Sequence, residues 1–203
     1  MTLSLPGLLD EIRACAHCAA DLPCGPRPVV QAARQARLRI VGQAPGRRVH
    51  ETGIPWNDQS GLRLRDWLGL SPECFYDPAK VAIIPMGLCY PGKGASGDKP
   101  PRPECAPRWH RRLDDCLPAL ELTLLIGQYA QAHYLGRLRK DSLTETVRAW
   151  RDYLPLGFLP LPHPSPRNVL WRMKNPWFEL ELVPELRRQV DALGLSRNQP
   201  VGP

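Results

Sequence analysis

The stretch LRIVGQAPG, residues 38–46, is the best guide to the fold. Its apolar start leads into a turn that contains Gly42, Pro45 and Gly46. A short apolar run ended by glycine and proline predicts a buried strand over 38–43, followed by a tight turn. Backbone amides in such a turn can bind an anion or a carbonyl oxygen, although ordinary strand-to-loop turns have the same composition.

Three more apolar runs predict strands, and the segments between them have the spacing of helices. The further strands are predicted over 81–86, 122–127 and 157–162. The helices are predicted over 3–14, 60–70, 104–120, 128–136, 141–154 and 175–195, the last with a kink at Pro184. Residues 91–103, PGKGASGDKPPRP, are predicted to form a loop without regular structure.

The alternation of strands and helices predicts an α/β fold. We expect three αβα layers around a central four-stranded, mostly parallel sheet. Ligands of such folds bind at the carboxyl ends of the strands. The segments QAPG, MGLC, GQYA and HPSPRN follow the four strands, so we expect them to meet at one edge of the sheet.

Length and composition indicate one domain and are compatible with a polyanionic partner, although many basic proteins bind nothing acidic. The 203 residues, 43% of them hydrophobic, suit a single domain over 1–195 with a disordered tail over 196–203. No apolar run is long enough to span a membrane and the start does not resemble a secretory signal, so we expect a cytoplasmic protein. We also expect a monomer. The net charge of +7 is compatible with nucleic acid as a partner.

The cysteine pattern indicates a metal site. The chain has seven cysteines, and an odd number without a secretory signal argues against a disulfide framework. Cys15 and Cys18 form a C-x2-C pair, while Cys89 follows a predicted strand and Cys105 begins a predicted helix. Four such thiolates can bind zinc or a [4Fe–4S] cluster. Four unrelated thiols are the alternative.

Two loops contain the residues best suited to chemistry. In WNDQSG (56–61), Trp56 can stack on a planar base or pack in the core, and Asp58 can activate water or form a turn. In HPSPRN (163–168), His163 precedes a proline that keeps its backbone extended. A lone histidine is structural more often than catalytic.

These motifs together resemble the uracil-DNA glycosylase superfamily. GQAPG (42–46) resembles the first motif of the superfamily and HPSPRN (163–168) the second, and the resemblance extends from Ile12 to Val190. It implies the αβα glycosylase fold and an enzyme of base excision repair that flips a damaged base out of DNA. In the first motif, backbone groups of Gln43 and Ala44 are expected to hold the carbonyls of that base.

The cysteines resemble the ligands of the iron–sulfur branches, families 4 and 5. The resemblance implies a [4Fe–4S] cluster bound by Cys15, Cys18, Cys89 and Cys105, with zinc as the alternative. We expect the cluster to be structural and to fix the N-terminal helix and the loop at 91–103.

The resemblance also implies roles for the two loops. TGIPW is similar to a family stretch whose aromatic residue stacks on uracil, which corresponds to Trp56. NDQSG resembles a family 5 stretch whose aspartate is the proposed water activator, which corresponds to Asp58. HPSPRN is most similar to the single-strand-selective monofunctional branch, in which the histidine, here His163, stabilises the anionic leaving base. From the same motif, Ser165, Arg167 and Asn168 are expected to contact DNA.

The chain departs from the branches at positions that set specificity. Gln43 and Ala44 stand where family 4 has glutamate and family 1 has aspartate. Pro85 stands where several branches have an asparagine that reads the uracil edge, and proline has neither a polar side chain nor an amide N–H. We therefore expect Pro85 to contact the substrate without reading that edge, and the specificity to include uracil, hypoxanthine or xanthine.

The sequence predicts a monofunctional DNA glycosylase. No lysine is placed for Schiff-base chemistry, so we expect no strand cleavage. The main alternative is a glycosylase-fold protein that binds damaged or single-stranded DNA without cleaving it, which Ala44 and Pro85 favour. A glycosylase that bonds covalently to abasic DNA through a histidine lacks support, because residues 90–101 contain no histidine. A zinc or iron–sulfur protein of unrelated function is a further alternative.

Overall fold

A parallel sheet forms the centre of the protein. The computed structural model describes residues 4–195. Its four-stranded sheet consists of β1 (Leu38–Val41), β2 (Val81–Ile83), β5 (Leu122–Ile126) and β6 (Phe158–Leu161). The strand order is β2-β1-β5-β6, and all neighbouring pairs are parallel. The predicted four-stranded α/β fold is confirmed.

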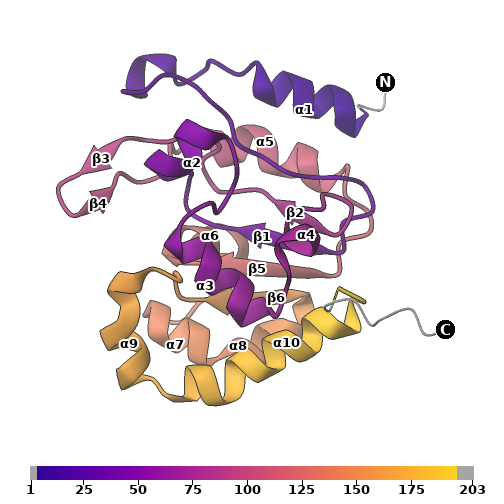
Figure 1. Ribbon diagram of the computed structural model, residues 1–203, viewed down its shortest axis with the longest axis vertical. Helices are drawn as coiled ribbons and strands as arrows, with labels where there is room; N and C mark the ends of the chain where they lie inside the picture. The colour runs from indigo at the N-terminus through magenta and orange to yellow at the C-terminus, as the bar shows by residue number, and fades with distance from the viewer. Residues whose placement is uncertain (1–3, 196–203) are drawn as a thin grey trace.

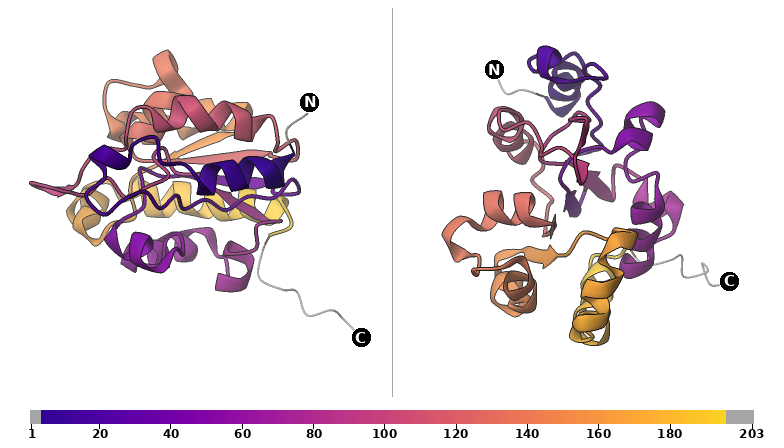
Figure 2. Two further views of the ribbon diagram at one scale, coloured as in Figure 1. Left: turned by 90° about the horizontal axis from the view of Figure 1, so that it is seen from above. Right: turned by 90° about the vertical axis from the view of Figure 1, so that its left-hand side faces the viewer.

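Helices cover both faces of this sheet and produce three layers (Figures 1 and 2). One face is covered by α3 (Gln59–Leu68) and α10 (Val183–Ala192). The other is covered by α5 (Cys105–Asp114) and α6 (Gln128–Leu135), and α1 (Leu5–Arg13) packs beside α5. The remaining α-helices of the described residues are α2 (Arg47–Thr52), α4 (Pro72–Phe75), α7 (Leu143–Arg148), α8 (Trp150–Tyr153) and α9 (Val169–Lys174).

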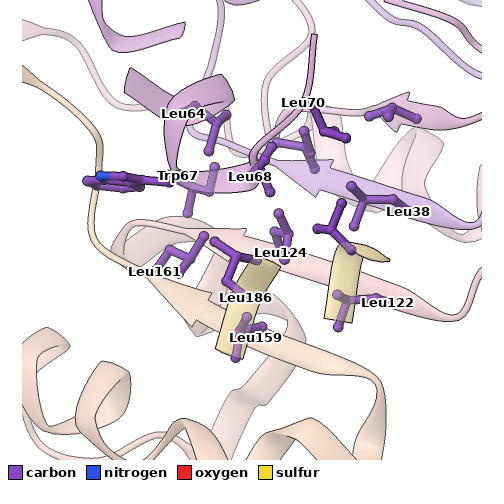
Figure 3. Close-up of a cluster of buried hydrophobic side chains, with 14 of the residues drawn as sticks. Leu38, Leu64, Trp67, Leu68, Leu70, Leu122, Leu124, Leu159, Leu161 and Leu186 are labelled. Carbon is purple, nitrogen blue, oxygen red and sulfur yellow. The ribbon is translucent and has the colours of Figure 1, made fainter. Parts of the chain in front are cut away.

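The strands are buried on both faces because apolar side chains alternate between two cores. Leu38 and Leu124 point toward α3 and α10, where Leu64, Trp67 and Leu186 pack against them (Figure 3). The neighbouring strand residues face α5 and α6 on the opposite side. Strands covered on both faces have nearly continuous apolar sequences, which explains why short apolar runs were sufficient to locate them.

The loops that follow the strands gather at one end of the sheet. In Figure 1 this is the left-hand end, where α2, α9 and a projecting hairpin lie. The hairpin consists of β3 (Lys93–Gly94) and β4 (Gly97–Asp98), which pair antiparallel. The prediction that 91–103 has no regular structure was therefore wrong. Gly94 pairs with Gly97 across a two-residue turn, and glycine at such turns is a hairpin signal.

Three helix predictions also need correction. The helix predicted over 141–154 is interrupted at Ala149, between α7 and α8. Pro184 lies in the first turn of α10, after a π-helical turn η5 (Phe178–Leu182), and so begins a helix instead of kinking one. The helix predicted to end at residue 120 stops at Asp114. The tail at 196–203 lies outside the described residues.

Candidate active site

A cavity opens at the carboxyl end of the sheet. Its volume is about 460 Å³, and it is lined by the turn after β1, the loop before α3, the end of β2, the β3–β4 hairpin and the segment after β6. It brings together most of the predicted site residues: Gln43, Ala44, Trp56, Asp58, Pro85, His163, Ser165 and Arg167. Residues 120 positions apart in sequence therefore share one site.

Trp56 is held in an unusual backbone conformation at the wall of this cavity. Its φ is 54°, and it is the only described non-glycine residue with a positive φ. Its carbonyl accepts hydrogen bonds from Arg65 Nη1 at 3.4 Å and from the Tyr76 hydroxyl at 3.5 Å. A side chain at Gly61 would collide with this carbonyl. Such strained conformations persist only when their surroundings fix them, and they cluster at functional sites.

The Trp56 ring lies between the first motif and the histidine of the second. A Cβ added at Gly42 would lie 2.9 Å from Trp56 Cζ2, so the ring packs directly on the glycine backbone. The ring centroid is 5.6 Å from that of His163, with a tilt of 32°. The aromatic face is thus fixed next to the group predicted to contact the base.

Asp58 is both a helix cap and a cavity residue. It is the N-cap of α3, and its Oδ1 accepts a hydrogen bond from the Gly61 N–H at 2.8 Å. The same half-buried side chain lines the cavity. The two interpretations of this aspartate are therefore compatible: the cap fixes one oxygen and leaves the other without a hydrogen bond from the described residues.

His163 lies in an environment that favours the neutral ring. Burial lowers its pKa, and the carboxylates of Asp58 and Asp98 oppose that shift without cancelling it. A neutral imidazole has one N–H to donate. The His163 carbonyl accepts a hydrogen bond from Asn168 Nδ2 at 2.8 Å. Asn168 therefore holds the loop in place. It does not line the first cavity but a smaller neighbouring one, which it shares with Gln43 and His163.

The end of β2 gives the cavity an apolar floor. The Pro85 carbonyl accepts a hydrogen bond from Nε2 of the buried His110 at 3.1 Å. Nδ1 of His110 lies 2.7 Å from the Tyr134 hydroxyl. Because a carbonyl can only accept, Nε2 carries the proton and Tyr134 donates to Nδ1. The Pro85 carbonyl is thus engaged by His110, and the Pro85 side chain offers the cavity only an apolar ring.

The β3–β4 hairpin forms a wall that the sequence prediction missed. Ser96, Gly97 and Asp98 line the cavity. Arg167 Nη1 donates to the Ser96 carbonyl at 3.4 Å, and Gln43 Nε2 donates to the Lys99 carbonyl at 2.9 Å. Gly94 and Gly97 are the sequence signal for the hairpin turn. The position of Asp98 at the cavity also depends on these long-range contacts, which the sequence does not show.

The four predicted ligand cysteines line a second, small cavity under α1 and α5: Cys15, Cys18, Cys89 and Cys105. Burial raises the pKa of Cys89 to about 11 and that of Cys105 to about 12. Within the described residues, no group of three or more histidine, cysteine or acidic side chains is arranged to hold a single metal ion.

The surroundings of these thiols nevertheless fit a thiolate-bound group. The Leu88 N–H donates to Cys105 Sγ at 3.3 Å. The Arg27 backbone and the Arg102 side chain lower the pKa of Cys89 and of Cys18, respectively, against the larger effect of burial. Hydrogen bonds to sulfur are typical of the environment of iron–sulfur clusters. The other cysteines have different positions: Cys24 is exposed, and Cys74 and Cys116 are buried in the hydrophobic cores.

Fold and site together define an α/β protein with an aromatic-walled cavity, large enough for a nucleobase, at the carboxyl end of a parallel sheet. The family model of the uracil DNA glycosylase superfamily matches residues 29–187. The chain belongs to this superfamily, which suggests a DNA glycosylase, a hydrolase of DNA repair. The match includes Cys89 and Cys105 but begins after Cys15 and Cys18. No helix among residues 4–195 has the length and apolar character needed to cross a membrane.

Proposed function

We propose that the protein is a monofunctional DNA glycosylase that removes a deaminated base by hydrolysing its N-glycosidic bond. The observation that carries this proposal is the meeting of three groups in one cavity: the Trp56 ring, the Asp58 carboxylate and the neutral His163. An aromatic face, an acceptor for a water proton and an N–H donor are the groups that excision of a flipped base requires.

DNA binding is supported by charge and by exposed apolar side chains next to the cavity. The chain has a net charge of +7, and Arg167 is exposed at the cavity rim. On α9, which follows directly, Leu170 and Met173 are 70% and 72% exposed. Apolar side chains can insert between base steps and kink the duplex. This segment would then support the strand from which the base has been flipped.

The chemistry follows from the positions of the three groups. The flipped base stacks on Trp56, and backbone groups at Gln43 and Ala44 hold its carbonyls. As the bond between the base and C1′ breaks, its electron pair moves onto the base, and the His163 N–H stabilises that charge. Asp58 orients a water toward C1′, accepts its proton and stabilises the sugar cation. The products are a free base and an intact strand with an abasic site.

Strand cleavage is not part of this proposal. A bifunctional glycosylase needs an amine to form a Schiff base with the sugar. Among the described residues that line the cavity, none is a lysine.

We further propose that the four cysteines bind a structural [4Fe–4S] cluster, with zinc as the alternative metal. A bound cluster would hold the four cysteines as thiolate ligands and join α1 to the segments around Cys89 and Cys105. This proposal is supported by the shared cavity, by the Leu88 N–H directed at Cys105 Sγ, and by the groups of Arg27 and Arg102 that favour thiolates at Cys89 and Cys18.

The test is an excision assay on oligonucleotides that contain uracil, hypoxanthine or xanthine, single-stranded and paired. We expect His163→Ala and Asp58→Asn each to lower the single-turnover rate by about two to three orders of magnitude. Asparagine caps helices as well as aspartate does, so Asp58→Asn removes the charge and retains α3. Ser142→Ala, which removes a cap from the distant α7, is the matched control and should be fully active.

Two outcomes would contradict the enzyme proposal. Tight binding of damaged DNA without excision of any base would identify a binding module in which Asp58 is only a cap. Wild-type activity in both site variants would place the chemistry elsewhere.

A further inference from the structure

The hairpin places a second carboxylate, Asp98, at the wall of the cavity. The side chain is exposed at the cavity mouth. Its Oδ1 accepts a hydrogen bond from the hydroxyl of the buried Tyr90 at 3.4 Å. A Cβ added at Gly46 would lie 3.5 Å from Oδ2, so the second oxygen faces the glycine of the first motif.

Within residues 4–195, no lysine, arginine or histidine side chain forms an ion pair with this carboxylate. The ion pairs of the described residues do not include Asp98. The nearby His163 is neutral near pH 7 because burial lowers its pKa. An ionised carboxylate can only accept hydrogen bonds. It would therefore bind a donor on the substrate and repel a carbonyl.

The apolar floor makes this wall more important for specificity. Pro85 has no side-chain polar group and no N–H, and its carbonyl already accepts a hydrogen bond from His110. Carbonyls of a base placed against that floor would lose their hydrogen bonds to water without compensation. A C–H edge of the base makes no hydrogen bonds to water and would lose none at that floor. Discrimination by hydrogen bonds must then come from the sides of the cavity.

The deaminated bases differ in what they would present to a carboxylate. On its Watson–Crick edge, hypoxanthine has a ring N–H between one carbonyl and one C–H. The corresponding N–H of uracil and of xanthine lies between two carbonyls. An acceptor-only group is attracted by the N–H and repelled by each flanking carbonyl, so it favours hypoxanthine. The cavity of about 460 Å³ has room for a bicyclic base.

We propose that Asp98 is a specificity-determining residue that accepts a hydrogen bond from a ring N–H of the base and favours a purine with a single flanking carbonyl over the imide bases. This inference rests on the proposed glycosylase function. It assigns the reading of the base edge to the hairpin wall, in place of the end of β2.

The experiment measures single-turnover excision of hypoxanthine, xanthine and uracil from otherwise identical oligonucleotides. The variant is Asp98→Asn, which keeps the shape, removes the charge and adds a donor that suits carbonyls. We expect the ratio of hypoxanthine to xanthine excision to fall about tenfold or more, the equivalent of one hydrogen bond to a charged group. Asp191→Asn, an exposed change on α10 outside the cavity, should leave the ratio unchanged.

A second variant tests the same inference through the group that holds Asp98. Tyr90→Phe removes the hydroxyl donor and keeps the buried ring, and it should shift the ratio in the same direction by a smaller factor.

The outcomes separate this inference from the proposed function. If the wild type excises none of the three bases, the glycosylase proposal fails. If the wild type is active and Asp98→Asn leaves the ratio unchanged, Asp98 does not read the base. If Asp98→Asn slows all three bases equally, the carboxylate acts on the sugar, and the specificity role is overturned.

Discussion

Gly42 shows how a single missing side chain shapes the site. The Trp56 ring packs against the backbone of Gly42. A Cβ at this position would lie only 2.9 Å from Trp56 Cζ2. We predict that Gly42→Ala displaces the ring from its position beside His163 and lowers excision by about 10- to 100-fold, as small misplacements of binding groups do. The single-turnover rate checks this. Gly7→Ala in α1 is the control, and an unchanged rate in Gly42→Ala would mean that the ring does not position the base.

His110 makes the stability of the protein depend on pH. Burial lowers its pKa to about 4, and His133 and Arg39 add to the effect. In the unfolded chain a histidine has a pKa of about 6.5, so between these values the unfolded state binds a proton that the folded state excludes. Stability is therefore present above pH 6.5 and is lost as the pH falls toward 4, by about 3 kcal/mol from His110.

We predict that His110→Gln flattens this dependence, because it removes the titrating group and keeps an N–H that can reach the Pro85 carbonyl. Denaturant unfolding at several pH values measures the effect. The exposed variant Asp191→Asn should keep the wild-type slope. An unchanged slope in His110→Gln would assign the acid sensitivity to His133 and His163, whose pKa values burial also lowers.

At the scale of one element, α3 begins on a residue that the proposed chemistry also uses. Asp58 caps the helix through the Gly61 N–H, and loss of an N-cap costs about 1 kcal/mol. We predict that Asp58→Ala lowers both the free energy of unfolding and the excision rate, whereas Asp58→Asn lowers only the rate. Denaturant unfolding and single-turnover assays on the same preparations separate the two. Equal destabilisation by both substitutions would show that the cap depends on the charge.

The elements that could be predicted from sequence are those whose burial is visible as apolar periodicity. All four sheet strands and α1, α3, α5 and α6 were located in this way, because each presents apolar side chains to a core. Short elements do not produce such a pattern. The hairpin depends on a two-residue turn and on contacts from Arg167 and Gln43, and α2, α4 and α9 have only four to six residues each.

The same limit applies to the candidate site. Trp56, Asp58 and His163 stand in motifs with unusual composition, so the sequence alone identified them. Asp98 stands in a Gly/Pro-rich segment, and its approach to the cavity depends on the Tyr90 hydroxyl and on the folding of the hairpin. The direction of the Pro85 carbonyl depends on His110, 25 residues further along the chain, and no local pattern predicts such a pairing.

At the scale of the whole molecule, the proposed cluster would add a covalent link between segments that also meet in one hydrophobic cluster. Cys15 and Cys18 follow α1, Cys89 follows the end of β2 and Cys105 begins α5, and one small cavity contains all four. Burial raises the pKa of the Cys89 and Cys105 thiols, which favours their neutral, protonated form. A bound metal would hold them as thiolates. Metal binding of this kind contributes directly to the free energy of folding.

We therefore predict that purified wild-type protein is brown and contains iron and inorganic sulfide, and that Cys105→Ser loses both together with several degrees of thermal stability. Chelation of the wild type should reproduce that loss. Cys24→Ser is the matched control, because Cys24 is exposed and lies outside the cysteine cavity, so its iron content and melting temperature should equal those of the wild type. A colourless wild type with one zinc per chain would replace the cluster with a zinc site. Full stability of Cys105→Ser without any metal would show that packing of α1 against α5 is sufficient to hold this end of the molecule.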